Sequence, residues 1–499
     1  MFTLLALLYV TNASALIVND TFTRDGNTYK VTQMIPGTVP GTTKTYNVAF
    51  VSSTNTTVNI PATVTDPNSQ YTFNVTAIAN NSTVPNATSV TMPNTIVSIE
   101  ANAFKDGHIT SITIPKSVTE IKSGAFGQMS YLTAINVDAA NPNFRSDNGV
   151  LIEKKDSKEW VAAYPLARPD AEYTVPEGVY GVYTNAFQRA ANLTKITLPA
   201  SLKESPSTAE FNGYTSAQNL REIAVAAGNT AFKSVDGVLL SADGKKLIAY
   251  PNGKAGSPST NPAYQGVTGQ PNASVYKIPD GVEIVGQAAF AQVNGLTAIE
   301  LNEVKKLAKG AFDKAVKLRN VLLGPSVDTI EDGAFGGNND LAAFDVDPAN
   351  PNYTADNGVI YTKNKEELVL FPAGKAGEYT TLPTTKKIRK RAFYYAQKVT
   401  KVNFNSNLEV IDGDAFQATT KLENITFEAP AKIKTIGTFA FQGSGLTELN
   451  IPASLEVVSW SAFGSTKLKK VTVADGSQLQ SINTGAFNGC KDLEEFTFE

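Results

Sequence analysis

The chain has few side chains that could act as a nucleophile, a general base or a metal ligand. Its 499 residues include one histidine, His108, and one cysteine, Cys490. One cysteine cannot form an internal disulfide, and the two residues together cannot supply the ligand cluster of a zinc site. Catalysis by a Ser-His or Cys-His pair would have to pass through His108, which has no partner motif. We therefore expect no metal and no cofactor, a surface or capping role for His108, and a partly buried Cys490.

Paired carboxylates are the other route to chemistry, because two acids suffice for glycoside hydrolysis. The chain has 46 acidic residues, so their number alone leaves that activity open. Nothing in their spacing places two of them across a pocket, and we predict a protein that is not an enzyme. The acids are balanced by 43 basic residues to a net charge of -3, which predicts no nucleic-acid partner.

The elements that would position any such group belong to a repeat. A six-residue pattern, L-x-x-I-x-I, occurs sixteen times when shorter versions ending at Met92, Val175, Ile278 and Leu382 are counted. The step between successive ends is 22 to 27 residues in twelve of fifteen cases, and 38, 53 and 36 residues in the others. Such a period is typical of solenoids. The full copies end at Ile114, Val137, Leu198, Val225, Leu301, Leu323, Val346, Phe404, Phe427, Ile451, Val473 and Phe498.

Each repeat has a second half, in which an apolar pair such as Leu455 and Val458 precedes an Ala-Phe pair. Alternation along a strand points the fourth and sixth pattern positions inward and the third and fifth outward. Stacked coils bury the inward residues against their counterparts, and the Ala-Phe pairs should form a phenylalanine column. We predict a β-rich leucine-rich-repeat solenoid, a curved rod with a parallel strand ladder. The alanines of the pairs are Ala103, Ala125, Ala186, Ala289, Ala311, Ala334, Ala392, Ala415, Ala440, Ala462 and Ala486.

Three inserts, at about residues 141–165, 229–273 and 350–372, account for the long steps. Each carries an Asp-Gly or Asp-Asn-Gly segment, and each ends at an aromatic residue before proline: Tyr164, Tyr250 or Phe371. Apolar stretches around a tip such as Asp243-Gly244 predict β-hairpins. The glycine segments resemble calcium loops, but they lack the alternating oxygen ligands and the closing glutamate, which favours turn chemistry.

The two ends differ from the repeat. Residues 1–15 combine an apolar run with the small-residue triplet Ala13-Ser14-Ala15, which predicts a signal peptide; we expect its start to be missing or misassigned, because no basic residue precedes the run. A buried N-terminal strand would explain the leucines but not the triplet. The run is too short to span a membrane. We expect a β cap over 16–57, a solenoid over 58–499, and a C-terminus truncated after the apolar strand that ends at Phe498.

These motifs together resemble the BspA-like leucine-rich-repeat family. The resemblance rests on proline after the strand, the Ser-Val-x-x-Ile segment, the Gly-Ala-Phe turn and the Asn-Pro-Asn-Phe inserts, and covers about residues 58–499. It implies a secreted or cell-surface protein that mediates adhesion or protein-protein recognition, with a host matrix protein or a microbial surface protein as partner. A departure at Pro206 and Glu210 predicts a local bulge or kink.

The outward ladder positions are the first candidate binding surface. Threonine and asparagine there are also ordinary solvated strand residues, and aromatic or arginine anchors are scarce, so we expect weak, multivalent binding. The insert aromatics, including Trp160 and Tyr361, are a second candidate, although packing of each insert explains the aromatic-proline pairs. Glycan binding, or a structural role in a larger surface assembly, stays open as the alternative. The candidate ligand-facing residues are Lys195, Thr197, Glu300, Asn320, Lys401, Asn403, Asn424, Thr426, Glu448, Asn450, Lys470 and Thr472.

Overall fold

The computed structural model describes residues 16–35, 45–204, 217–258 and 274–499. Contacts group the chain into two compact units, formed by residues 1–171 with 175–193 and by residues 172–174 with 194–499. The predicted signal peptide, the irregular repeat at Pro206 and Glu210, and most of the loop in the second insert lie outside the described residues. Within them, no helix is long and apolar enough to cross a membrane.

The first unit begins with a sheet that leads into the repeats. Tyr29, Phe50 and Phe73 alternate with outward residues and are fully buried, so this sheet extends the apolar core of the first coils. Three strands pair antiparallel, the third runs parallel to a long strand, and that strand continues into short coil strands. They are β1 (Thr21–Arg24), β2 (Asn27–Ile35), β3 (Thr45–Ser53), β5 (Thr63–Thr65), β6 (Thr72–Thr83), β8 (Ser98–Ile99) and β10 (Glu120–Ile121).

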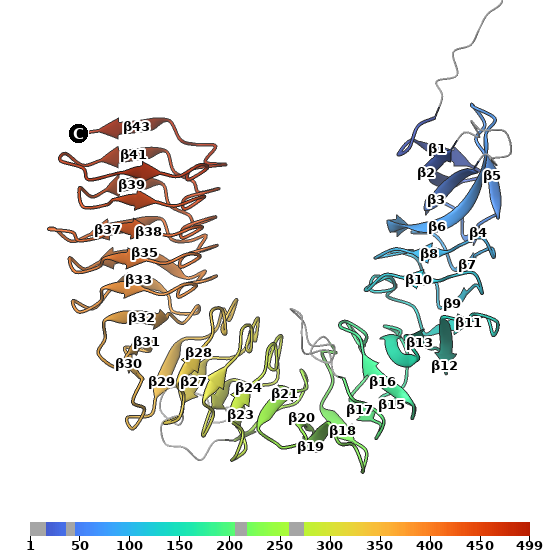
Figure 1. The fold of residues 1–499 in the computed structure, drawn as a ribbon, viewed down its shortest axis with the longest axis horizontal. Helices are drawn as coiled ribbons and strands as arrows, with labels where there is room; N and C mark the ends of the chain where they lie inside the picture. Colours follow the sequence, from blue (N-terminus) through green and yellow to red (C-terminus); the bar gives the residue numbers. More distant parts are fainter. Residues whose placement is uncertain (1–15, 36–44, 205–216, 259–273) are drawn as a thin grey trace, which may run out of the picture. The chain divides into compact units, whose positions relative to one another are not determined.

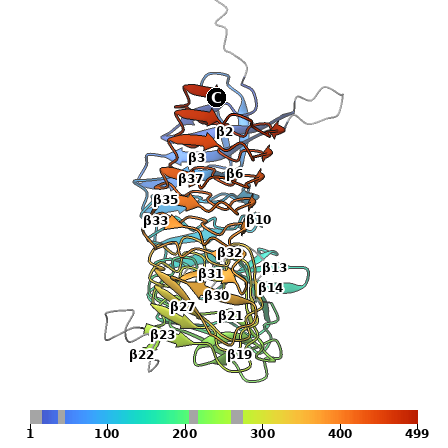
Figure 2. The ribbon, with the colours of Figure 1, turned by 90° about the vertical axis from the view of Figure 1, so that its left-hand side faces the viewer.

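Every full copy of the predicted L-x-x-I-x-I pattern forms a strand, and most neighbouring copies pair in parallel, which confirms the predicted ladder. We call these strands, together with the strands of the four shorter copies and one strand that precedes them, the first ladder (Figure 1). They are β4 (Thr57–Asn59), β7 (Ser89–Thr91), β9 (Ser111–Ile114), β11 (Ala134–Val137), β15 (Glu172–Thr174), β17 (Lys195–Leu198), β18 (Glu222–Val225), β23 (Ser274–Lys277), β25 (Ala298–Glu300), β27 (Asn320–Leu323), β29 (Ala343–Val346), β33 (Gly377–Thr380), β35 (Val399–Phe404), β37 (Asn424–Phe427), β39 (Glu448–Ile451), β41 (Lys470–Val473) and β43 (Glu495–Phe498). Figure 2 shows β33, β35 and β37 one above another.

The apolar pair of each repeat forms a second, shorter parallel ladder. Most of its strands have two residues, and several end on a buried aliphatic residue of the core, such as Ile388, Ile411 or Val458. Beside β8 and β10, the strands are β16 (Val179–Val182), β24 (Ile284–Val285), β26 (Lys306–Leu307), β28 (Thr329–Ile330), β34 (Lys387–Ile388), β36 (Val410–Ile411), β38 (Thr435–Ile436), β40 (Val457–Val458) and β42 (Ser481–Ile482).

The Ala-Phe pairs form the predicted phenylalanine column. Phe371, Phe393, Phe416, Phe441, Phe463 and Phe487 stack in turn, with ring centroids 4.3 to 5.4 Å apart. Offset or parallel aromatic contacts add to the burial of each ring. Phe371 belongs to the third insert and Tyr250 to the second, where it stacks on Phe290 at 5.1 Å. The aromatic of the aromatic-proline pair therefore takes the place of a repeat phenylalanine.

The predicted insert hairpins are present, and a further strand precedes each of them. The three strands form an antiparallel meander whose last strand pairs in parallel with the next strand of the second ladder. Each insert therefore supplies one coil of that ladder itself. The meanders are β12 (Phe144–Asp147), β13 (Val150–Lys155) and β14 (Lys158–Ala163); β19 (Phe232–Val235), β20 (Val238–Ser241) and β21 (Lys246–Ala249), after which β22 (Ser257–Pro258) pairs with β23; and β30 (Tyr353–Asp356), β31 (Val359–Thr362) and β32 (Glu367–Leu370).

The asparagine that opens each insert fixes it to the preceding coil. Asn350 is 1% exposed and donates from Nδ2 to the carbonyls of Gly324 and Val327, at 2.8 and 3.0 Å. Its Oδ1 accepts from the backbone N–H groups of Asn352 and Tyr353, at 2.8 and 2.9 Å. One buried amide thus satisfies four polar groups, which explains the Asn-Pro-Asn motif.

The Asp-Asn-Gly segments are tight turns, as predicted. Asn357 and Gly358 have φ of 48° and 78°, the left-handed pair of a type I′ hairpin turn. The turn lies against the last strand before the insert, where Phe344 donates its N–H to Gly358 O at 3.0 Å. Each insert turn in this way covers the free edge of β11, β18 or β29 and ends a segment of the first ladder.

Candidate functional site

Side-chain alternation on the first ladder is clearest in β39. Leu449 and Ile451 are buried, at 2% and 1% exposure, whereas Glu448 and Asn450, which alternate with them along the strand, are exposed. The parallel register repeats this arrangement from coil to coil, so outward residues form rows across the strands. We call the outward side of the first ladder the ladder face.

The predicted ladder residues differ in exposure. Asn320 and Thr472 are buried, at 2% and 8% exposure, so the expectation that they face a ligand is wrong. Asn320 lies in register between Ala298 and Ala343, beside the apolar contact of Val275 with Ala298. The exposed candidates are Asn424, Thr426, Glu448, Asn450 and Lys470, and the half-buried ones are Lys195, Thr197, Glu300, Lys401 and Asn403.

Thr472 is buried because of the side chains beside it in the neighbouring coils. Its strand places it in register between Asn450 and Thr497. Thr497 Oγ1 lies 3.5 Å from Thr472 Oγ1, and the short threonine side chain is covered from both sides. The position of a residue in the pattern therefore predicts which side of the strand its side chain faces, but not whether that side chain is exposed to solvent.

Lysines of the ladder face pair with carboxylates one coil away. Lys195 Nζ lies 3.0 Å from Glu222, and Lys470 Nζ lies 3.0 Å from Glu495. Lys401 Nζ lies 3.5 Å from Glu378. The hydrogen bonds to Glu222 and Glu495 raise the pKa values of Lys195 and Lys470, so both stay charged at neutral pH. Such exposed pairs stabilise a fold little and can exchange partners.

Polar side chains continue this pattern by hydrogen bonding across three coils. Asn403 donates to Thr380 Oγ1 at 3.2 Å and accepts from Thr426 Oγ1 at 2.7 Å. Thr380, Asn403 and Thr426 are in register. The ladder face is therefore polar, and its Lys195, Lys401, Lys470, Asn403 and Thr426 are paired with side chains of neighbouring coils.

The side chains first considered for catalysis lie apart from this face. His108 is exposed and stacks on Tyr131, with ring centroids 4.7 Å apart. Cys490 is partly buried, and its Sγ lies 3.1 Å from both Phe463 O and Thr466 Oγ1. In the part of the chain that the structure describes, no group of three or more His, Cys, Asp or Glu is placed to hold a metal.

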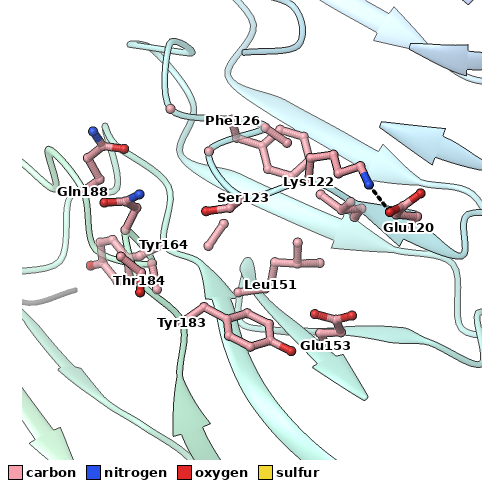
Figure 3. Close-up of a pocket in the computed structure, with 18 of the residues that line it drawn as sticks. Glu120, Lys122, Ser123, Phe126, Leu151, Glu153, Tyr164, Tyr183, Thr184 and Gln188 are labelled. Atoms are coloured by element: carbon pink, nitrogen blue, oxygen red, sulfur yellow. Dashed lines mark hydrogen bonds and ion pairs between the residues drawn. The ribbon is translucent and has the colours of Figure 1, made fainter. Parts of the chain in front are cut away.

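The insert aromatics are mostly structural. Tyr164, Tyr250, Tyr361 and Phe371 are 0 to 5% exposed and contact the core, consistent with their packing role. Trp160 differs, because it is only half-buried and stacks on Tyr183 at 5.0 Å with nearly parallel rings. Tyr183 lines a cleft of about 640 Å³ beside the first insert, which sequence reasoning missed (Figure 3).

The chain is similar to several bacterial proteins of known structure, at low sequence identity. A search of curated proteins found no match. Among solved structures, a leucine rich cell surface protein of Faecalibacterium prausnitzii is 16% identical over 96% of this chain and 94% of its own, with a TM-score of 0.40. A leucine-rich repeat protein of Eubacterium ventriosum is 19% identical over 70% and 82% of the two chains, also with a TM-score of 0.40. One of Bacteroides ovatus is 16% identical over 96% and 100%, with a TM-score of 0.33.

The family comparison is the decisive one. The model of the BspA type leucine rich repeat region matches residues 43–147, 171–235, 269–370 and 378–499, in six copies. These ranges contain most of the strands of both ladders. The chain therefore belongs to the BspA type leucine-rich repeat family.

Proposed function

We propose that this chain is a secreted or cell-surface protein that recognises a protein ligand through the ladder face, without catalysis. The observation that supports this most is the alternation of outward polar residues with buried or half-buried apolar ones in β35, β37, β39 and β41. A solenoid of this kind offers an extended binding surface that grows with the number of coils. Adhesion to a host matrix protein or to a microbial surface protein is the role that fits it.

The pairing on the ladder face determines the kind of binding. Because Lys401 and Lys470 already have carboxylate partners, a ligand must replace these exposed ion pairs with its own. Exchanging one exposed ion pair for another changes the free energy little. Among the described residues, the exposed part of the face also lacks the Trp, Tyr and Arg anchors that dominate tight interfaces. Affinity must then come from several weak contacts on successive coils, so it depends on ionic strength and on ligand valency.

The test is a binding screen of the full chain against immobilised matrix proteins, bacterial cells and a glycan array. The double variant Lys401→Glu, Lys470→Glu reverses two charges on the face, and Lys467→Glu, an exposed lysine outside the strands, is the matched control. We expect the double variant to lose at least about tenfold in apparent affinity for a protein ligand while the control is unchanged. Unchanged binding by both would refute the ladder face as the site. Turnover of a glycan that one carboxylate substitution abolishes would refute the absence of catalysis.

A further inference from the structure

The first and third inserts join the solenoid in the same way, so their junctions can be compared residue by residue. Each junction lies between a Gly-Ala-Phe turn, at Gly124 or Gly333, and the last strand of the meander, β14 or β32. At both places the second ladder is interrupted, because β10 and β28 pair only with the preceding coil. The two junctions nevertheless differ in what fills the gap.

The third junction is filled by the chain itself. A Cβ placed on Gly333 would lie 3.2 Å from Nη1 of Arg391, and one on Gly336 would lie 3.4 Å from the ring of Tyr394. Tyr353 donates its hydroxyl to Asp328 O, a carbonyl at the edge of β28, at 3.0 Å. A guanidinium, a phenol ring and a hydroxyl therefore occupy this space.

The first junction lacks all three groups. The residues equivalent to Arg391, Tyr394 and Tyr353 are Asn185, Gln188 and Phe144, which are shorter or have no hydroxyl. Nothing lies within 4 Å of a Cβ placed on Gly124. The space left is a cleft of about 640 Å³, a volume within the range of ligand sites.

One wall of the cleft is an open strand edge. Every residue from Thr119 to Gly127 lines the cleft. In coils followed by another coil, the equivalent carbonyls accept from the next strand, as Lys386 O and Ile388 O do. No backbone donor among the described residues pairs with Thr119 O or Ile121 O. Such an edge is a template for one more extended strand.

The opposite wall and the floor are mixed in character. Ala162 and Ala163 supply partly exposed apolar surface, Leu151 and Phe126 are buried in the lining, and the Glu120–Lys122 ion pair lies at the rim (Figure 3). Tyr183 stacks on Trp160, whereas the equivalent residues of the third insert, Arg389 and Glu367, form an ion pair of 2.6 Å. Burial, together with the charge of Glu153 and a hydrogen bond to it, raises the pKa of Tyr183, so its hydroxyl stays protonated.

We propose that this cleft binds an extended peptide segment of another protein, which pairs with the edge of β10 and places an apolar or aromatic side chain against the partly exposed Ala162 and Ala163. Amide N–H groups of the peptide would donate to Thr119 O and Ile121 O, as strand addition requires. A glycan could use the aromatic wall but has no reason to match the regular spacing of backbone acceptors. The cleft is separate from the ladder face, so this inference does not depend on the proposed function.

The test copies the third junction into the first. The variant Phe144→Tyr, Asn185→Arg, Gln188→Tyr should close the cleft, and the backbone permits it because Asn185 and Arg391 share a positive φ, at 69° and 59°. A phage-displayed library of linear dodecapeptides is selected on the full wild-type chain and counter-selected on the variant. Selected peptides should bind the closed variant at least about tenfold more weakly, and N-methylation of alternate peptide amides should cost about tenfold each.

Controls separate the possible outcomes. The double variant Lys401→Glu, Lys470→Glu should keep full peptide affinity, since it alters only the ladder face. If the triple variant does not fold, Phe144→Tyr alone adds one hydroxyl toward Thr119 O and should still weaken binding severalfold. Peptide should also slow hydrogen exchange of the Ile121 amide in the wild-type chain. Peptides that bind the closed variant equally well, an empty selection, or glycans whose binding the closure removes would each overturn the proposal.

Discussion

The phenylalanine column gives the sharpest test of what holds the solenoid together. Phe416 is fully buried, and its ring stacks on Phe393 at 4.3 Å and on Phe441 at 4.8 Å. Truncation of a buried phenylalanine to alanine costs about 3 to 5 kcal/mol, and each lost aromatic pair adds about 0.5 to 1.5 kcal/mol. The measured truncation costs already include such lost ring contacts, so the two ranges are not summed, and we expect Phe416→Ala to reduce the stability of its coils by about 4 kcal/mol.

The effect should be local, because each coil contacts only its neighbours. Hydrogen exchange of the amides in β36 and β38 measures it directly, and about 4 kcal/mol corresponds to roughly 1000-fold faster exchange. Phe416→Leu keeps most of the volume and should cost about 1 to 1.5 kcal/mol. Phe498→Ala, at a ring that is 71% exposed, is the control and should change stability by less than about 0.5 kcal/mol. Exchange in the Phe416→Ala chain within twofold of the control would refute the column as the source of cohesion.

Three further changes test the inserts. Asn350→Ala removes an amide that satisfies four backbone groups and should lower the free energy of unfolding in urea by about 3 kcal/mol. The control Asn352→Ala, at an exposed residue, should lower it by less than about 1 kcal/mol. Equal losses would contradict the anchoring role of Asn350. Gly358→Ala should lower the free energy of unfolding more than Gly377→Ala does, because both glycines have a positive φ but only the first substitution would bring a Cβ within 2.9 Å of the Ala343 Cβ. The free energies of thermal unfolding of the two variants should differ by about 1 to 2 kcal/mol. Equal values would argue against close approach of the turn to β29. The hydrogen bond from Arg145 holds the pKa of Glu159 below its ordinary 4.5, so the folded state favours the charged carboxylate, and its stabilisation is lost as the pH falls through the folded pKa. The difference in Tm between wild type and Glu159→Gln should therefore shrink below about pH 4.5, and a constant difference down to pH 3 would contradict the pairing.

Most of the fold followed from the spacing of apolar residues. Leucine, isoleucine and valine at fixed offsets require a strand of period two, and a stack is the structure that buries them when one coil cannot. Alanine before phenylalanine likewise predicted the column, because the two residues recur together at the turn. The additional strand in each insert was missed, since β12 and β30 carry polar residues such as Arg145 and Thr354 that give no strand signal.

The sites were less predictable, because accessibility depends on neighbours that lie one coil away. Thr472 has the outward position of Asn450, yet longer or equal neighbours on both sides bury it. The cleft beside the first insert exists because Phe144 and Asn185 lack the hydroxyl and the guanidinium of their equivalents in the third insert. There, Tyr353 and Arg391 fill the same space. A direct comparison of the two inserts within the sequence would have revealed the difference but not the free edge of β10.

The central claim is recognition through the ladder face, and site-specific photocrosslinking measures it most directly. A photoreactive side chain at Asn450, which is exposed on β39, should form covalent adducts with a bound protein ligand. The same group at Lys467, outside the strands, should form none. Adducts from Lys467 and none from Asn450 would contradict the account.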